Sequence, residues 1–285
     1  MGMAVAEAQF MGDRISKRNF DKLARFIYDY SGIKMPPTKL TMLEGRLRRR
    51  LRATNHVSFD DYCDFLFQED GLEQESVYLI DAVTTNKTDF FREARHFEYM
   101  QQVALPALAA SGMRTIRTWS SACSTGAEPY TMAMVLEEFA EGRGDVNYSI
   151  LATDLSTDVL QTAQRGIYAE DLVQPVPRDL QRKYVMVAKQ AGRREIRISP
   201  LLRSRVGFAR MNLMDDKYPV GDPMHMIFCR NVLIYFDKPT QSAVLTRLSN
   251  CLAKGGYMFI GHSESLIGSH PGLKLVGRTI YQRTA

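Results

Sequence analysis

From Arg114 onward, short apolar runs of strand length alternate with longer stretches that have helical spacing. This alternation favours a mostly parallel sheet with helices on both faces, because each crossover between parallel strands needs a helix-length connection. The predicted strands cover residues 115–119, 148–153, 205–209, 224–229, 257–261 and 273–283. Helices are predicted at 129–140, 157–164 and 240–252, and Lys254-Gly255-Gly256 is interpreted as a sharp turn between the last helix and its strand.

The alternation lapses between Gln174 and Arg205. Residues 194–199 alternate charged with apolar side chains, as a half-buried strand does. They follow Ala191-Gly192-Arg193, which has the composition of a hairpin turn. The sequence therefore predicts a small antiparallel β-subdomain inserted at about residues 176–205.

The segment before the sheet region has helical spacing throughout and no β-rich run. Apolar residues from Phe20 to Tyr30 recur three and four positions apart, Ser58 resembles an N-cap, and a further helix follows Gly71. A chain of 285 residues is long enough for two domains. We expect a loose leader at 1–13, an all-helical domain at 14–85 and the sheet domain at 86–285.

Composition favours an intracellular globular protein. No basic segment followed by an apolar core begins the chain, and no run approaches the roughly 18 apolar residues of a membrane span. The four cysteines are scattered without a CxxC pair, so neither a zinc site nor a disulfide framework is indicated. A reducing cytoplasm is the simplest interpretation, and the net charge of +5 is mild for this size.

A candidate cofactor site follows the first predicted strand. The run Thr115–Trp119 gives way to small residues and Gly126 before a helix starts near Glu128, and the next strand ends on Asp154. Small residues allow a ligand to lie against such a turn, and the carboxylate is placed to hold a ribose diol. Because the Gly-x-Gly-x-x-Gly pattern is absent, NAD is disfavoured and a nucleoside cofactor without phosphate, such as S-adenosylmethionine, fits better.

Other polar residues are predicted at the same edge of the sheet. Asn212 and the pair Arg230-Asn231 each follow a predicted strand, where open α/β sheets bind ligands. Residues 85–93 bracket two phenylalanines with Asn86, Thr88 and Arg92, and suit either an interdomain ligand site or a capped helix start. His262 ends another strand and is left unassigned, because a lone histidine is more often structural.

One predicted helix has an apolar face and an arginine-rich face. At helical spacing, one face holds Leu40, Leu43, Leu47 and Leu51, and the opposite face holds Arg46, Arg48, Arg49, Arg50 and Arg52. A basic face is often only a solvated surface, but five arginines in seven positions favour docking onto an acidic partner. Composition alone leaves nucleic acid, an anionic membrane and an acidic protein helix open.

Six segments taken together resemble the CheR family of chemotaxis receptor glutamate methyltransferases. They are NKTDFFRE (86–93), SACSTGAEPYTMA (121–133), ILATDLS (150–156), NLMDD (212–216), FCRNVLIYFD (228–237) and GGYMFIGHSES (255–265). The resemblance covers about residues 14–283. It implies an α/β fold with a class I, Rossmann-like methyltransferase domain, an all-α N-terminal domain and a small antiparallel β-subdomain. It also implies methyl transfer from S-adenosylmethionine to receptor glutamates, giving glutamate methyl esters and S-adenosylhomocysteine.

The resemblance assigns site residues. The residues that would line the cofactor are Asn86, Thr88, Arg92, Glu128, Asp154, Asn212, Leu213, Arg230 and Asn231. Arg92 and Tyr235 would lie nearest the reacting centre as candidate catalytic residues, and no metal is expected. Ala127 departs from the family, which usually has a first Glu in Gly-Glu-Glu-Pro-Tyr, but Glu128 is retained, so cofactor binding is expected to persist.

The resemblance also suggests a partner for the arginine face. Receptor methylation regions are helical bundles with acidic side chains, and Arg46, Arg49 and Arg50 are the candidate docking residues. The enzyme is then expected in the cytoplasm, reaching the membrane only through the receptor, as a monomer and without nucleic acid. Residues 189–194 carry one glycine rather than a Gly-x-Gly insertion, which disfavours strong tethering to a receptor C-terminal peptide.

Two alternatives stay open. A nucleic-acid methyltransferase would use the arginines on phosphates, but residues 230–235 lack the Pro pair with which such enzymes usually receive a flipped base. A non-enzymatic adaptor that senses S-adenosylmethionine would form no S-adenosylhomocysteine.

Overall fold

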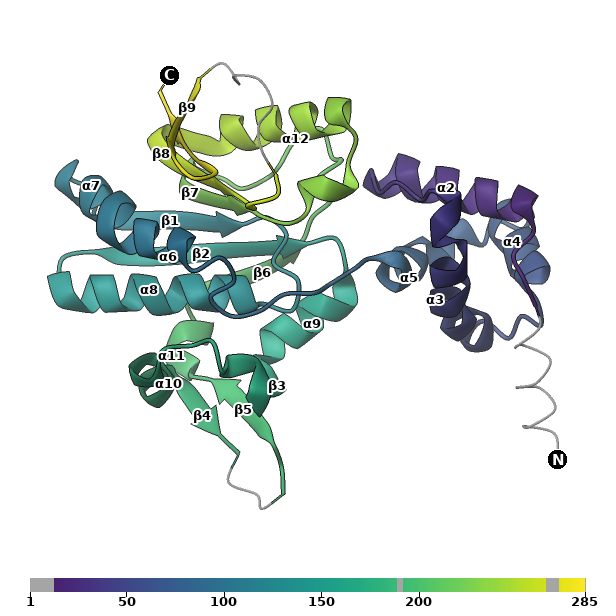
Figure 1. Ribbon diagram of the computed structural model, residues 1–285, viewed down its shortest axis with the longest axis horizontal. Coiled ribbons are helices and arrows are strands. Elements are labelled where there is room, and N and C mark those ends of the chain that lie inside the picture. Colours follow the sequence, from purple (N-terminus) through teal and green to yellow (C-terminus); the bar gives the residue numbers. More distant parts are fainter. Residues whose placement is uncertain (1–12, 189–191, 265–271, 285) are drawn as a thin grey trace. The chain divides into compact units, whose positions relative to one another are not determined.

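The computed structural model describes residues 13–188, 192–264 and 272–284, which divide into two compact units. The helical unit comprises the described residues up to Thr85 together with Tyr235–Asp237, and the sheet unit comprises the rest (Figure 1). The predicted fold class is confirmed: an all-α N-terminal domain accompanies an α/β domain that carries a small antiparallel sheet.

The helical unit packs its helices through the apolar faces predicted from spacing. Its helices are α2 (Lys17–Ser31), η1 (Pro37–Lys39), α3 (Leu40–Ala53), α4 (Phe59–Gln68) and α5 (Leu72–Val83). Leu23, Ile27, Leu43 and Leu47 are fully buried. The Ser58 hydroxyl accepts the Asp61 N–H, so the predicted cap starts α4.

The sheet unit is built on a seven-stranded sheet in the order β6-β2-β1-β7-β8-β10-β9 (Figure 1). The parallel strands are β1 (Thr115–Ser120), β2 (Asn147–Asp154), β6 (Val206–Arg210), β7 (Met224–Cys229) and β8 (Leu252–Ile260). The connecting helices α8 (Ala127–Arg143) and α9 (Thr157–Arg165) lie on one face, and α12 (Lys238–Cys251) lies on the other. Crossovers between parallel strands are right-handed. The chain moves from β1 toward β6 in one direction along the sheet and from β7 to β8 in the other, so the connecting helices lie on opposite faces.

Helical segments α6 (Arg95–Tyr99), η2 (Met100–Ala104, a π-helix) and α7 (Leu105–Ala110) precede β1 and follow residues 85–93, for which a capped helix start was one of two interpretations. The ring of Phe97 from α6 stacks on Phe228 of β7, which in turn stacks on Phe259 of β8 with centroids 4.2 Å apart. This aromatic stack lies in the core beside the carboxyl ends of β7 and β8, so α6 packs beneath the loops that follow these strands.

Two sequence predictions at the end of the chain were wrong. The run 273–283 forms two antiparallel strands, β9 (Leu273–Gly277) and β10 (Ile280–Arg283), because the chain reverses at Thr279 with φ 54°. The segment 254–256 is not a turn between helix and strand but lies inside β8. There Gly255 has φ 77° and the register against β7 shifts, as in a β-bulge, where glycine tolerates the left-handed conformation.

The small sheet has three antiparallel strands in the order β3-β5-β4. They are β3 (Ile167–Ala169), β4 (Val185–Val187) and β5 (Glu195–Ile198), accompanied by η3 (Glu170–Val173), α10 (Arg178–Tyr184) and α11 (Pro200–Arg203). The alternation predicted for 194–199 is seen in β5, where Ile196 and Ile198 are buried. The sheet starts before residue 176 because β3 is too short to give a periodic signal; Ala191 of the predicted turn lies outside the described residues.

Across the described part of the chain, the helices fall short of the length and apolarity that crossing a bilayer requires.

Candidate active site

Polar residues gather where the parallel strands end. Ser120, Asp154, Cys229 and Ile260 close β1, β2, β7 and β8, and all four strands point the same way. The carboxyl edge of such a sheet is where open α/β folds bind ligands. The structure therefore brings the segments predicted from sequence to one rim.

Asp154 anchors the loop that follows β1. Its Oδ2 accepts the Ser124 N–H at 2.8 Å, and its Oδ1 accepts the Ser156 N–H at 3.0 Å. The Ser124 hydroxyl donates to the carbonyl of Asn86 at 2.9 Å, which attaches the segment before α6 to the same loop. Asp154 thus fixes the turns after β1 and β2, beside which the ribose is predicted to lie.

A buried arginine joins three of the segments. The Arg230 side chain is only 2% exposed, and its Nη1 lies 3.1 Å from Oε2 of Glu128. Its Nη2 lies 3.2 Å from Oε2 of Glu93 and also donates to the carbonyl of Arg92. The guanidinium lies over the Phe97 ring at 5.3 Å. We call Glu93, Glu128 and Arg230 the buried ion network.

The buried ion network holds two carboxylates against one guanidinium. Burial raises the pKa of Glu128, although Arg230 and the Ser120 hydroxyl, which donates to Glu128 Oε1 at 2.7 Å, oppose that shift. Burial also acts to raise the pKa of Glu93, but Arg230 and the His262 N–H outweigh it and bring the pKa below its ordinary value. With both acids ionised, the network has one uncompensated negative charge, which suits a cationic ligand such as a sulfonium.

Other predicted site residues lie in loops of the sheet unit. Arg92 is partly exposed and donates through Nη1 to the carbonyl of Lys87 at 3.0 Å. The Asn212 side chain accepts the Met214 N–H at 3.0 Å and so shapes the loop after β6. Leu213 is buried, and Thr88 is partly exposed in the segment before α6.

The two candidate catalytic residues fall in different units. Arg92 belongs to the sheet unit, whereas Tyr235, from η4 (Leu233–Tyr235), belongs to the helical unit, where its carbonyl accepts the Lys34 N–H at 3.2 Å. Their joint role at a reacting centre stays a prediction.

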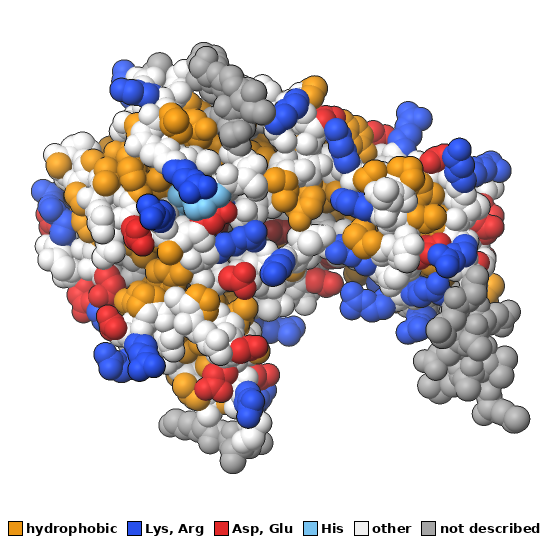
Figure 2. Space-filling model, in the orientation of Figure 1, with side chains coloured by type: hydrophobic (Ala, Val, Ile, Leu, Met, Phe, Trp, Pro, Cys, Tyr) orange, Lys and Arg blue, Asp and Glu red, His pale blue; other side chains and the backbone are white. Residues whose placement is uncertain are grey.

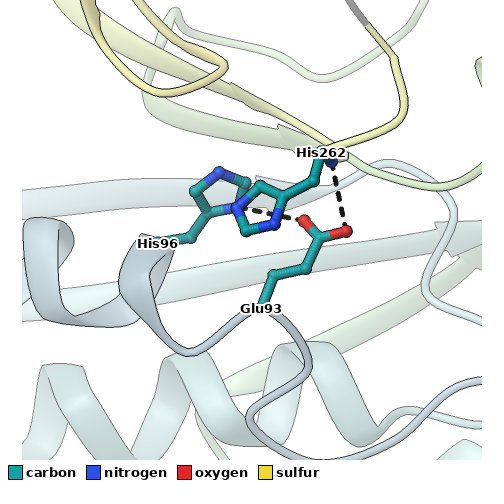
Figure 3. A group of neighbouring side chains, drawn as sticks. All are labelled: Glu93, His96 and His262. Carbon is teal, nitrogen blue, oxygen red and sulfur yellow. Dashed lines mark hydrogen bonds and ion pairs between the residues drawn. The ribbon is translucent and has the colours of Figure 1, made fainter.

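The described residues include one group that offers metal-ligand atoms: Glu93, His96 and His262, within 4.8 Å of one another (Figure 3). His96 lies 1% exposed, and its Nε2 is 3.2 Å from the Arg278 carbonyl, so this nitrogen carries the proton. Its Nδ1 faces Glu93 Oε2 at 3.4 Å, and burial lowers the His96 pKa to about 4. Oε2 of Glu93 also pairs with Arg230, so the same carboxylate oxygen faces both a guanidinium and an imidazole.

Three of the five arginines on the predicted docking face of α3 have partners within the helical unit. Arg46 donates to the carbonyls of Val83 and Thr84, at the C-terminal end of α5, at 2.5 and 2.6 Å. Arg50 forms a two-pronged pair with Glu75, at 2.6 and 2.8 Å, and lies over the Tyr78 ring. Both residues therefore hold α3 to α5 inside the helical unit.

Arg48 is also engaged, since its guanidinium lies over the Phe59 ring and donates to the carbonyl of Asp13. Arg49 and Arg52 are exposed, and no hydrogen bond or ion pair joins their side chains to another described residue. Figure 2 shows basic side chains over the region where Figure 1 draws α3. Arg49 and Arg52 are thus the two arginines of this face that are exposed and have no described partner, and we call them the accessible arginines.

Sequence reasoning missed three residues of the rim: Glu93, His96 and Glu264. Glu264 is 6% exposed and accepts backbone N–H groups of Asn231, Gly261 and Ile234. Glu93 and Glu264 lie inside two of the segments quoted for the family resemblance, and that position was the available signal. His96 stands alone in the sequence and carried no signal.

A doubly wound sheet with polar loops at its carboxyl edge and an acid at the end of β2 is typical of α/β proteins that bind a nucleoside cofactor, the class to which S-adenosylmethionine-dependent methyltransferases belong. Two family models match the chain: the CheR methyltransferase SAM-binding domain over residues 86–281, and the CheR methyltransferase all-alpha domain over residues 18–84. The chain therefore belongs to the CheR methyltransferase family, and S-adenosylmethionine is its cofactor.

Curated relatives agree along nearly the whole chain. The chemotaxis protein methyltransferase of Borreliella burgdorferi is 37% identical over 260 residues, covering 90% of this chain and 90% of the relative. That of Escherichia coli is 37% identical over 271 residues, covering 94% and 91%. Chemotaxis protein methyltransferase 2 of Pseudomonas aeruginosa is 35% identical over 266 residues, covering 93% of each.

Proposed function

We propose that this methyltransferase esterifies glutamate side chains of chemoreceptors in the cytoplasm, acting as a monomer. The observation that carries the proposal is the match of residues 86–281 to the CheR SAM-binding domain, whose rim holds the buried ion network. The relatives are named chemotaxis protein methyltransferases, which supports a chemoreceptor as the acceptor.

The chemistry asks little acid–base work of the protein. When bound, S-adenosylmethionine supplies an electrophilic methyl group on a sulfonium. A glutamate carboxylate has a reference pKa of about 4.3, so it is already an anionic nucleophile at neutral pH and needs no general base. The residues of this chain therefore act by aligning the two reactants and excluding water.

We assign roles on that basis. Asp154 holds the ribose hydroxyls, while Asn86, Thr88, Glu128, Asn212, Leu213, Arg230 and Asn231 line the cofactor. Arg92 orients the acceptor carboxylate, since a guanidinium can bind it in a bidentate way, and Tyr235 donates a hydrogen bond without adding charge. Arg92→Ala and Tyr235→Phe are expected to reduce methyl transfer more than cofactor affinity.

The network's excess charge is tested by comparing the cofactor with its neutral product. Glu128→Gln should weaken binding of S-adenosylmethionine more than binding of S-adenosylhomocysteine, because only the first carries a sulfonium. Titration calorimetry with both ligands measures the ratio, and Glu98→Gln, an exposed site on α6, is the matched control. Equal losses for the two ligands would contradict the electrostatic role.

The receptor is proposed to dock on the accessible arginines of α3. Arg49→Glu/Arg52→Glu should reduce receptor methylation at low salt and leave the fold intact, since both side chains are exposed. Reversal of Arg46 or Arg50 is unsuitable because it would break contacts within the helical unit. Lys17→Glu/Arg18→Glu on exposed α2 positions applies the same charge change as a control. Equal methylation by the two double variants would argue against α3 as the docking face.

Activity itself is tested with methyl-tritiated S-adenosylmethionine and membranes that carry chemoreceptors. Label on a receptor band that mild base releases is expected for a carboxyl methyl ester. Label on added RNA or DNA instead would overturn the proposal in favour of a nucleic-acid methyltransferase.

A further inference from the structure

Asn231 has an unusual backbone conformation at the rim. It follows Arg230 directly after β7, and its φ of 58° lies in the left-handed region. Residues with a side chain rarely occupy this region, although asparagine tolerates it better than most. Such a conformation persists only where neighbouring groups hold it.

Glu264 holds the backbone of this turn. Its Oε2 accepts the N–H of Asn231 at 2.7 Å and of Gly261 at 2.9 Å, and its Oε1 accepts that of Ile234 at 3.2 Å. Burial raises the Glu264 pKa, and these backbone donors oppose the shift. One buried carboxylate thus joins the loop after β7 to the loop after β8.

The close approach explains a glycine in the second loop. A Cβ at Gly261 would lie 2.6 Å from Glu264 Oε2 and 2.8 Å from Asn231 Nδ2. Any side chain there would displace either the carboxylate or the amide. Gly261 therefore leaves the space in which Glu264 and Asn231 meet.

Glu93 holds the side chain of the same residue. Its Oε1 accepts from Asn231 Nδ2 at 3.2 Å and from the His262 N–H at 3.1 Å, as the dashed line to His262 shows (Figure 3). Because an ionised carboxylate only accepts, the amide must turn its NH2 toward Glu93. Its Oδ1 is then left as an acceptor, and no described residue donates to it.

We propose that Glu93 and Glu264 are positioning residues that hold Asn231 so that its Oδ1 accepts an N–H of the cofactor. Glu264 sets the backbone and Glu93 sets the orientation of the amide. This inference rests on the proposed role of Asn231 in cofactor binding. The donor on the cofactor is either the adenine amino group or the α-ammonium group, which share this chemistry.

The test is the affinity for S-adenosylhomocysteine, measured by calorimetry on the full chain without receptor. Glu93→Gln, Glu264→Gln and Asn231→Ala should each weaken binding at least tenfold, while Glu98→Gln leaves it unchanged. Glu93→Gln added to Asn231→Ala should cost less affinity than Glu93→Gln alone, because part of its effect passes through the amide and the rest through its contact with Arg230. Full affinity in the single variants, or losses that multiply in the double variant, would overturn the proposal.

Thermal unfolding checks that the variants fold. If Glu264→Gln fails to fold, Asn231→Asp serves instead. This variant keeps the backbone N–H that Glu264 accepts but places a second carboxylate beside Glu93. Its affinity for S-adenosylhomocysteine should also fall at least tenfold. S-inosylhomocysteine and the α-deaminated product analogue identify the donor. The analogue that lacks the donating group should bind the wild-type protein weakly, and Asn231→Ala should not weaken its binding further. If Asn231→Ala weakens the binding of both analogues as much as that of S-adenosylhomocysteine, the proposal is overturned.

These outcomes separate the inference from the proposed function. If the wild-type protein binds S-adenosylhomocysteine but labels no receptor, the acceptor assignment fails while the positioning roles remain measurable. If the receptor is methylated but the losses of affinity in Glu93→Gln and Asn231→Ala add up fully in the double variant, the positioning roles fail while the proposed function stands.

Discussion

Arginines in the two units differ in what surrounds them. Arg230 in the sheet unit is 2% exposed and paired with two carboxylates, whereas Arg49 on α3 is exposed. Arg50, one residue further along α3, is 20% exposed and pairs with Glu75, itself 4% exposed. The comparison teaches that neither arginine density nor position on a helical face predicts availability to a partner; the carboxylates of neighbouring elements decide it.

The largest effect is expected at Arg230. Arg230→Ala would leave Glu93 and Glu128 buried without a counter-charge, which typically costs about 3–5 kcal/mol of unfolding free energy. Arg230→Lys keeps the charge but not the fork that reaches two acids, so it should lose less. Denaturant unfolding of both variants measures the loss of unfolding free energy. If Arg230→Ala is as stable as the wild-type protein, the buried Arg230 does not differ from the exposed Arg49 in its contribution to stability.

His96, beside the same network, should make stability depend on pH. Its pKa of about 4 when folded lies below the ordinary histidine value of 6.5, so between these values the unfolded chain binds a proton that the folded chain does not. Stability is therefore lost as pH falls from 6.5 to 4, by on the order of 3 kcal/mol. His96→Gln keeps a donor for the Arg278 carbonyl and should flatten this window, as urea titrations at several pH values would show. An unchanged slope would mean that the loss arises at another titratable group.

The internal arginine of α3 is expected to come next. Arg50→Ala removes two charged hydrogen bonds to a buried carboxylate, for which about 2 kcal/mol is typical. Thermal or urea unfolding should show the loss at any salt concentration, because the pair is largely shielded from solvent. A loss that vanishes at high salt would indicate that Arg50 is in fact exposed.

The smallest effect on stability is expected at the accessible position. Arg49→Ala should change the unfolding free energy by less than about 0.5 kcal/mol, as surface substitutions usually do. The same unfolding experiment as for Arg50 makes the comparison direct. A cost similar to that of Arg50→Ala would show that Arg49 also has a structural partner.

The sequence by itself determined the fold class and the family. Helical spacing before residue 84 and the alternation after residue 114 depend on local periodicity, and the acid at the end of β2 was identified from its place after an apolar run. The same reasoning failed at Lys254-Gly255-Gly256, because a bulge inside a strand and a turn before it have the same composition.

Only the tertiary structure decided which charged groups are free and how the rim is held. Arg46 and Arg50 bind partners more than twenty residues away, and Glu264 reaches back to Asn231 across β8. Such contacts leave no periodic trace in the sequence. Each depends on where the packing of helices and strands places two distant side chains, and burial then makes their pairing necessary, since an unpaired charge removed from water is costly.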